Sequence, residues 1–327
     1  MFAVVGTVPD EDFPLVSGKV TMDGDKICIQ GHSVPVNRGT PALLAAAIKT
    51  CETLNSNLPF GCLVGDIGKG AGSRRLYATL VEQLTSFDSG PGDSQLKTDK
   101  RSETGTDLNV FVFHYLQPDV DWHNRILMAM EKMRKRPVLI ADAGFMYAAK
   151  MSGFAAEYDL FTPDAGELAF LADEAAPHPF YTRGFILHEE NKIPELIARA
   201  YEHENAARCL LVKGKTDYVV DEKQIHATVD TPLEDAMEAM GGTGDTLVGI
   251  VSALIGTGMS VIKAAALAAK VNRWAGHYAR PTPATQVIEI IEQIPRAFSR
   301  VLREGEIGDD DIWTTPLHRV DTKFPLT

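Results

Sequence analysis

A glycine-rich segment in the C-terminal third of the chain has the composition of an anion-binding helix start. Residues 240–255 include Gly241, Gly242, Thr243 and Gly244 and continue as a strongly apolar helical pattern. The first turn of a helix carries unpaired N–H groups and the positive end of the helix dipole. Glycine lets that backbone approach a phosphate closely. These four residues therefore predict an anion hole.

Asp245 falls in the first turn of the same predicted helix, where its carboxylate would face the bound anion. A carboxylate at this place can orient a hydroxyl nucleophile and accept its proton during phosphoryl transfer. A structural alternative remains open, because Thr243 could cap the helix and Asp245 could only complement its dipole. Short motifs of this kind often match by chance. The neighbouring segments are therefore needed to choose between the catalytic and the structural interpretation.

Residues 241–249 resemble a segment of the ribokinase-like superfamily. The pattern Gly-Gly-Thr-Gly-Asp-Thr-Leu-x-Gly is most similar to the ADP- or ATP-dependent NAD(P)H-hydrate dehydratase branch of that superfamily. Three more segments follow the family's order: an Asp-Ala pair at 142–143, Thr-Pro-x-x-Gly-Glu-Leu at 162–168, and Lys-Gly-x-Thr at 213–216. The resemblance spans about residues 3–276 and is strongest after Leu139.

The resemblance implies a nucleotide site assembled from these segments, with ATP or ADP and Mg²⁺ as cofactors. It places Asp142, Lys213, Gly214 and Thr216 near the nucleotide, and it gives Glu167 a role in arranging Mg²⁺-bound water. Helix capping or dipole compensation would explain the two acids equally well, and a lysine at a strand end can simply extend to solvent. We expect no structural metal, because the histidines lack zinc-site spacing.

The N-terminal half carries a weaker resemblance to the acceptor site of sugar kinases. Residues 65–68 and Gly72 are similar to a glycine region of those enzymes. The resemblance implies that Asn37, Gly39 and Asp66 bind the acceptor substrate.

Short β-branched runs alternate with helical patterns, which is typical of an α/β fold with a mainly parallel sheet. The resemblance implies the ribokinase-like version of it, a three-layer αβα sandwich. We expect strands at 3–5, 61–64, 110–114, 138–141, 158–162 and 209–213, and a small N-terminal hairpin at 18–30 that turns at Asp23-Gly24. Helices are expected at 40–54, 73–84, 122–133, 165–172, 194–204, 243–255, 260–278 and from about 284 to 302.

One domain is expected over residues 1–303. Residues 86–108 are polar and glycine-rich, cannot bury enough apolar surface to offset their ordering, and are predicted to form a mobile loop. Residues 304–327 are predicted to be an acidic tail.

Composition narrows the classes of partner. The chain has 32 basic and 44 acidic residues, a net charge of −12, and 45% hydrophobic residues, which excludes global disorder. An acidic surface repels nucleic acid and anionic lipid, so we expect neither as a partner. The absence of a long apolar run, of a basic leader and of paired cysteines predicts a cytoplasmic protein. A homo-oligomer remains open.

These patterns favour an enzyme that transfers phosphate from ATP or ADP to a hydroxyl of a small molecule. The resemblance implies NAD(P)H-hydrate dehydration, in which the phosphorylated hydroxyl leaves by elimination. A kinase for a sugar or for a pyrimidine or thiazole alcohol stays open, because Thr231-Pro232 replaces the dehydratases' Asn-Pro and Asp164 replaces a usual histidine. A non-catalytic nucleotide sensor is a remoter alternative, since a pure binder gains nothing from Asp245 beside a phosphate.

Overall fold

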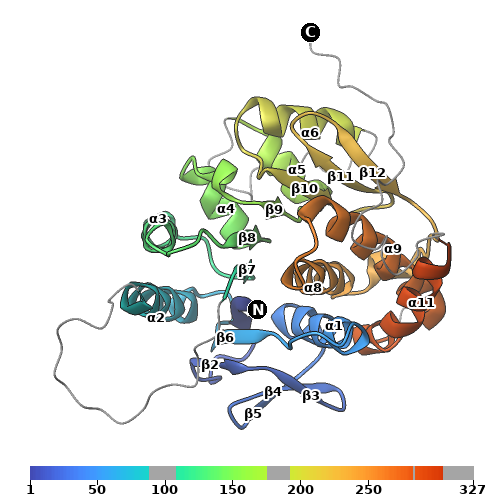
Figure 1. The fold of residues 1–327 in the computed structure, drawn as a ribbon, viewed down its shortest axis with the longest axis horizontal. Coiled ribbons are helices and arrows are strands. Elements are labelled where there is room, and N and C mark those ends of the chain that lie inside the picture. Colours follow the sequence, from blue (N-terminus) through green and yellow to red (C-terminus); the bar gives the residue numbers. More distant parts are fainter. Residues whose placement is uncertain (88–107, 175–191, 283, 305–327) are drawn as a thin grey trace.

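A nine-stranded sheet forms the centre of the protein in a computed structural model that describes residues 1–87, 108–174, 192–282 and 284–304 (Figure 1). In order across the sheet, the strands are β12 (Ile225–Val229), β11 (Asp217–Asp221), β10 (Cys209–Val212), β9 (Leu160–Phe161), β8 (Val138–Ala141), β7 (Val110–His114), β1 (Phe2–Val8), β6 (Phe60–Gly65) and β2 (Val16–Lys19). Strands β10 to β6 in this order pair in parallel, whereas β2, β11 and β12 pair antiparallel at the edges. The expected mainly parallel sheet is confirmed.

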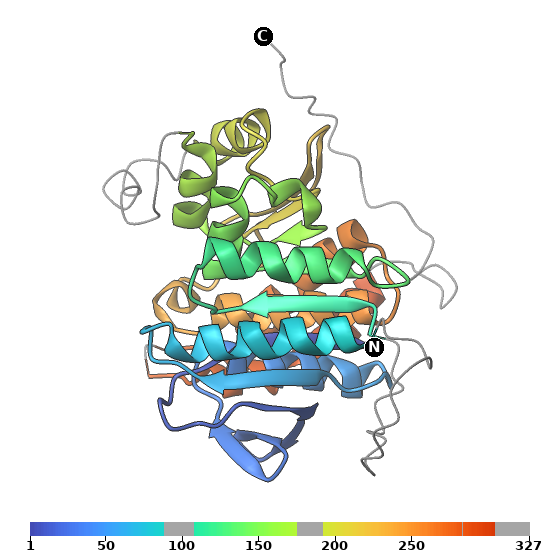
Figure 2. The same ribbon diagram turned by 90° about the vertical axis from the view of Figure 1, so that its left-hand side faces the viewer.

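Helices cover both faces of this sheet, as Figures 1 and 2 show. One face carries α1 (Thr40–Thr53), α8 (Thr243–Gly256), α9 (Val261–Ala279), α10 (Val287–Ile291) and α11 (Ile294–Glu304). The other carries α2 (Ala71–Phe87), α3 (Val120–Glu131), α4 (Gly144–Met151), α5 (Ala165–Ala172) and α6 (Ile193–Glu202). Phe2 and Val4 of β1 join one hydrophobic core, and Ala3 and Val5 join the other. Burial on both faces explains why β1 is almost wholly apolar, and the three-layer αβα sandwich is confirmed.

Helices α1 and α8 cross at close range, and this crossing brings their first turns to the same end of the sheet. A Cβ atom on Gly249 of α8 would lie 2.2 Å from the Leu43 carbonyl oxygen and 2.9 Å from the Ala46 Cβ of α1. Only glycine permits this approach, since such distances are far inside van der Waals contact. Gly249 therefore sets the spacing between the two helices.

Substituting Gly249→Ala is expected to lower the free energy of unfolding by about 1–3 kcal/mol through overpacking, although alanine is the better helix former. Denaturant unfolding measures this change. Gly214→Ala is the control, because a Cβ there meets only the Thr216 carbonyl oxygen at an ordinary 3.6 Å. Equal stability of Gly249→Ala and wild type would contradict the close crossing.

A second, three-stranded sheet lies in the N-terminal part of the chain, in the order β3 (Thr21–Asp23), β4 (Lys26–Ile29) and β5 (His32–Pro35). The expected hairpin is confirmed in its β3–β4 part, with Gly24 in the turn at φ 58°. The expected range of 18–30 was wrong at its start, since Gly18 belongs to β2 and pairs with Gly61 of β6. The sequence did not indicate β5.

Three further differences from expectation concern short elements. Residues 158–162 contribute only the two-residue strand β9, because the Asp159 carboxylate instead accepts a hydrogen bond from the Leu139 N–H at 2.9 Å. The last amphipathic segment is two helices, α10 and α11, rather than one. Helix α4 and the edge strands β11 and β12 were not expected, since they are short and lack strong boundary signals.

The expected loop and tail boundaries shift slightly. Helix α2 continues to Phe87, past the expected loop start at 86, and the rest of that loop, 88–107, lies outside the described residues. Helix α11 ends at Glu304, and 305–327 also lie outside them. Among the described residues, no helix combines the length and apolarity that a bilayer span requires.

Candidate functional site

Polar side chains gather where the parallel strands end. His114 is the last residue of β7, Asp142 and Thr162 directly follow β8 and β9, and Lys213 follows β10. Asp245 enters the same edge from the first turn of α8. Ligands of open α/β sheets bind at the carboxyl ends of the strands, so this edge is the candidate site.

Asp142 and Lys213, both expected at the nucleotide, form a buried ion pair. The Lys213 Nζ lies 2.9 Å from Asp142 Oδ1, and the Thr162 hydroxyl donates to the same oxygen at 2.6 Å. Burial would raise the pKa of Asp142, but the Lys213 charge and His114 outweigh burial and hold it well below its usual range. Burial would likewise lower the pKa of Lys213, yet the nearby carboxylates raise it. Both groups are therefore charged at neutral pH.

Glu167 lies on the other side of Lys213, in the first turn of α5. Its Oε2 accepts the Asp164 N–H at 2.8 Å, and Asp164 Oδ1 accepts the Glu167 N–H at 2.8 Å, which is a capping box. The same Oε2 is 3.9 Å from the Lys213 Nζ, and the Tyr147 hydroxyl donates to Oε1. Burial raises the pKa of Glu167 to about 8, with Lys213 opposing the shift. Glu167 thus caps its helix and also faces the candidate site.

The glycine-rich segment forms the start of α8. Gly242 is the N-cap of α8 with φ 100°, a left-handed conformation that favours glycine, and it makes no side-chain capping bond. Thr243 donates its hydroxyl to the Met237 carbonyl oxygen at 3.2 Å instead of capping. A Cβ on Gly244 would lie 3.5 Å from the Lys213 Cδ, so the lysine passes beside the first turn. A Cβ on Gly241 would lie 3.6 Å from the Arg38 Cδ.

The N-terminal loop expected to bind the acceptor meets Asp245 directly. The Gly39 N–H donates to Asp245 Oδ2 at 2.5 Å. The Asn37 carbonyl oxygen lies 3.3 Å from where a Gly242 Cβ would stand, and the Asn37 side chain is exposed beside it. Gly39 is also the N-cap of α1, with φ 69°. The structure thus brings two of the three expected acceptor residues to the glycine-rich segment.

Asp66, the third expected acceptor residue, is engaged by its own loop. Its Oδ1 accepts the N–H groups of Gly68 and Gly70 at 3.0 Å, and its Oδ2 accepts the N–H and hydroxyl of Ser73 at 2.9 Å. Burial opposes ionisation, yet these four donors lower the pKa of Asp66. The carboxylate orders the start of α2, and a role in acceptor binding stays a prediction.

The turn that contains Gly214 and Thr216 is held by a residue that the sequence did not single out. Arg273 of α9 is buried, and its Nε lies 2.8 Å from Asp217 Oδ2. Its guanidinium also donates to the carbonyl oxygens of Gly214 and Lys215 at 2.8 Å. Five donors in one planar group suit this clamp. Arg273 therefore fixes the turn that follows Lys213.

His114 was also missed, although it lies at the centre of the site. Its Nε2 is 3.4 Å from Asp142 Oδ2 and 3.3 Å from Asp245 Oδ1, and its Nδ1 is 3.2 Å from the Thr40 hydroxyl. Burial would lower the pKa of this fully buried imidazole, but the two acids raise it to about 9. The only sequence signal for His114 is its position at the end of an apolar predicted strand.

The His114, Asp142 and Asp245 ligand atoms lie within 4.8 Å of one another, a spacing that a proton or a metal ion can bridge. A protonated Nε2 has no lone pair for a metal. The two acids raise the pKa of His114 to about 9, which favours a proton at this place. Among the described residues, His114 Nε2 is the buried side-chain polar atom without a hydrogen-bond partner, so the two carboxylates face the ring by charge rather than through a hydrogen bond.

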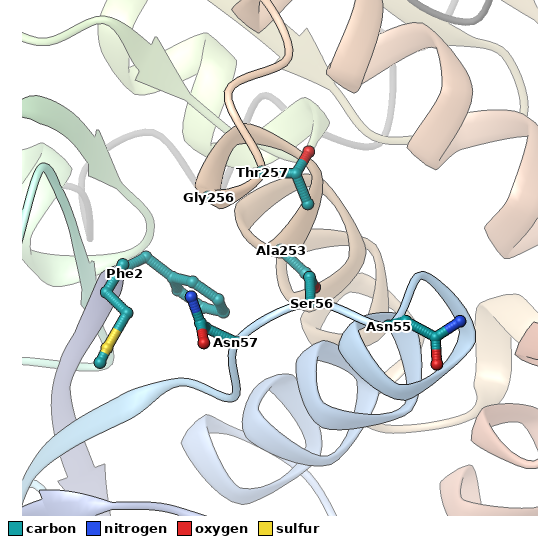
Figure 3. A pocket seen from close by; sticks show the side chains of 8 residues that line it. Phe2, Asn55, Ser56, Asn57, Ala253, Gly256 and Thr257 are labelled. Atoms are coloured by element: carbon teal, nitrogen blue, oxygen red, sulfur yellow. The ribbon is translucent and has the colours of Figure 1, made fainter.

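A cavity of about 290 Å³ lies at the opposite end of the sheet. It is lined by Met1, Phe2, Asn55, Ser56, Asn57, Ala253, Gly256 and Thr257 (Figure 3). Phe2 begins β1 and Gly256 ends α8, so the cavity lies at the amino end of β1, away from Asp245. No side chain with an ionisable group lines it, and we assign no chemistry to it.

Comparison with known proteins gives a family for the chain. A family model described as NAD(P)H-hydrate dehydratase matches residues 117–296. The chain is 37% identical over 262 residues to an uncharacterized protein of Methanocaldococcus jannaschii, covering 80% of this chain and 100% of that one. It is 28% identical to an ADP-dependent (S)-NAD(P)H-hydrate dehydratase of Cenarchaeum symbiosum, covering 49% of this chain and 52% of that one.

Solved structures share the fold at low sequence identity. A ribokinase-like superfamily protein of Enterococcus faecalis is similar with a TM-score of 0.52 and 15% identity, over 91% of this chain and 86% of that one. A mutant phosphofructokinase-2 of Escherichia coli gives a TM-score of 0.51 and 14% identity, over 91% and 99%. Since the family model matches more than half of the 327 residues, the chain belongs to the NAD(P)H-hydrate dehydratase family of enzymes, and it shares the fold of the ribokinase-like protein.

Proposed function

We propose that the protein transfers a phosphoryl group from ATP or ADP to the hydroxyl of hydrated NAD(P)H and then eliminates phosphate to restore the nicotinamide ring. The observation that carries this proposal is the place of Asp245. Its carboxylate lies in the first turn of α8, beside the glycine-rich backbone, and accepts the Gly39 N–H of the N-terminal loop. Asp245 thus stands between a place for a phosphate and a place for an acceptor.

In the first step, the acceptor hydroxyl oxygen bonds to the terminal phosphorus while the bond from phosphorus to the bridging oxygen breaks. The nucleotide leaves with that electron pair, and Asp245 takes the hydroxyl proton. In the second step, the carbon–oxygen bond breaks and phosphate leaves with its electrons. A proton is then lost from the neighbouring carbon, and the ring double bond forms.

The other expected residues bind and orient the nucleotide. The N–H groups at 241–244 would donate to the transferring phosphate as a preorganised hole. Lys213, beside Gly244, would add a positive charge. Mg²⁺ bound with the nucleotide would neutralise phosphate charge. The Glu167 carboxyl, whose pKa burial raises to about 8, would lose its proton beside that ion and would then offer an oxygen that arranges Mg²⁺-bound water.

A kinase acting on a sugar or on a pyrimidine or thiazole alcohol is the second candidate, since it needs only the first step. The observation that favours it is Asp164. The family's usual histidine is replaced by this aspartate, and here its side chain is used to cap α5. The chain therefore lacks a histidine that the resemblance leads us to expect in a dehydratase.

Incubation of the protein with hydrated NADH and either ATP or ADP separates the two candidates. The proposal predicts that absorbance at the NADH band returns and that phosphate is released in equal amount. Omitting the nucleotide is the control and should give no return. If hydrated NADH is inert while a sugar or a pyrimidine or thiazole alcohol becomes phosphorylated, the kinase function replaces the dehydratase function.

A further inference from the structure

Resting on the phosphoryl transfer proposed above, we propose that His114 is the positioning residue of this site. Its side chain lies between Asp142 on the nucleotide side and Asp245 on the acceptor side, and it holds the proton acceptor at a fixed place relative to the nucleotide. The family comparisons give no role to His114, and the two steps above do not use it.

The Thr40 hydroxyl fixes the orientation of the His114 ring. Its Nδ1 lies 3.2 Å from the hydroxyl of Thr40, the first residue of α1, which also points to the His114 carbonyl oxygen. A Cβ on Gly6 of β1 would lie 2.6 Å from the Thr40 hydroxyl oxygen and 2.8 Å from the His114 carbonyl oxygen. Gly6 therefore leaves just enough room for Thr40, and Thr40 directs Nε2 of His114 toward the two acids.

The two carboxylates favour an N–H at Nε2, and the raised pKa of the ring adds the proton on Nδ1 that makes it an imidazolium. A neutral ring with its lone pair on Nε2 would face two carboxylate oxygens at 3.3 and 3.4 Å, which is repulsive. The groups that face the ring are Asp142 after β8, Asp245 of α8, Thr40 of α1, the adjacent Tyr115 ring at 4.6 Å, and, behind Asp142, Lys213 after β10. Lys213 binds Asp142 Oδ1, whereas His114 faces Asp142 Oδ2 and Asp245 Oδ1, so the charged ring is a counter-charge for Asp245.

The distance between His114 and Asp245 suits a residue that positions the proton acceptor without forming an ordinary hydrogen bond to it. Ordinary N–H···O hydrogen bonds measure about 2.9 Å, whereas Nε2 is 3.3 Å from Asp245 Oδ1. The imidazolium thus offsets the repulsion between Asp142 and Asp245 by charge. It leaves the Asp245 oxygens able to accept the hydroxyl proton, while the Gly39 N–H fixes Oδ2 from the other side.

Kinetics against pH test the role of His114. His114→Gln keeps a polar side chain but no charge, and it is expected to lower kcat with hydrated NADH and ATP about 10²-fold, the cost of misplacing a reacting group by about 1 Å. The KM for ATP should change much less. Because the pKa of His114 is about 9, wild-type kcat should fall as pH rises through 9, and the variant should lack this fall.

His123→Gln is the matched control. His123 is also fully buried, but it contacts Tyr158 and Ser152, and burial lowers its pKa to about 4. A kcat loss in His114→Gln no larger than in His123→Gln would overturn the positioning role. So would purified protein that carries a stoichiometric transition metal and loses it in His114→Gln, because that metal would occupy the proton's place.

A measurement without turnover separates this inference from the proposed function. The histidine ring signals of the folded protein are followed by NMR against pH, and the His114 ring signal is assigned through bonds from its own backbone, which requires no variant. We expect its pKa near 9, and Asp142→Asn and Asp245→Asn should each lower it. If no acceptor is turned over but the pKa of His114 behaves in this way, the proposed function fails. The charged contact of His114 with Asp142 and Asp245 then still stands. A wild-type His114 ring whose pKa is at or below the ordinary histidine value of about 6.5 overturns this charged contact. This result stands even if His114→Gln does not fold.

Discussion

Asp245→Asn is expected to lower turnover of the acceptor about 10²–10⁴-fold, the loss typical of removing a general base. The substitution keeps the size of the side chain and an oxygen that can still accept the Gly39 N–H, so the contact between α8 and the acceptor loop can persist. Nucleotide affinity should hold or increase, because a negative charge beside the phosphate is removed. Steady-state kinetics give the first quantity, and calorimetry gives the second.

Asp164→Asn is the control for this prediction. Asp164 is the N-cap of α5, and asparagine caps helices as well as aspartate does. It should therefore retain turnover close to wild type. Turnover by Asp245→Asn at the wild-type rate would mean that another group takes the hydroxyl proton.

Lys213→Met is expected to cost about 3 kcal/mol of stability, the lower end of the range for breaking a buried ion pair. The substitution leaves the Asp142 carboxylate, 3% exposed, facing His114 and the Thr162 hydroxyl but without its lysine. Denaturant unfolding measures the loss. Nucleotide affinity should fall as well, because Lys213 lies along Gly244 at the start of α8.

The double variant Lys213→Met with Asp142→Asn tests the cause. Removing both charges should recover part of the stability, since the penalty arises from one unpaired buried charge. The pH dependence has a defined sign. The pKa of Asp142 is lowered in the folded protein, so its contribution to stability is present above the ordinary aspartate pKa near 3.9 and is lost as pH falls below it. A double variant less stable than Lys213→Met alone would refute this explanation.

Elements with strong local signals could be predicted from the sequence. Helix α5 was predicted with the observed bounds, because Asp164 and Glu167 form a capping box before an apolar run. The start of α8 was predicted at Thr243, because Gly241 and Gly242 precede a long apolar helical pattern. Elements whose bounds depend on residues elsewhere in the chain were not predicted well. Strand β9 is the example, because Asp159 beside it is bound by Leu139 and Arg136.

The residues of the candidate site also fall into those that the sequence predicted and those that it did not. Asp142, Lys213 and Asp245 were expected together, and the structure brings them to one edge of the sheet because parallel strands end there. His114 and Arg273 escaped notice, since their partners are far away in the chain and neither has a motif. Asp66 shows the opposite case. Its glycine-rich surroundings suggested an acceptor site, whereas those same residues supply the N–H groups that occupy its carboxylate.

The fate of the acceptor oxygen tests the central claim most directly. Hydrated NADH carrying ¹⁸O in its ring hydroxyl is turned over once with unlabelled ATP or ADP, and the released phosphate is analysed by mass. Phosphoryl transfer to that hydroxyl followed by elimination predicts one ¹⁸O atom in each phosphate, because the carbon–oxygen bond is the one that breaks. Unlabelled phosphate with the label in water would mean that the hydroxyl leaves without being phosphorylated, and the role proposed for Asp245 would be wrong.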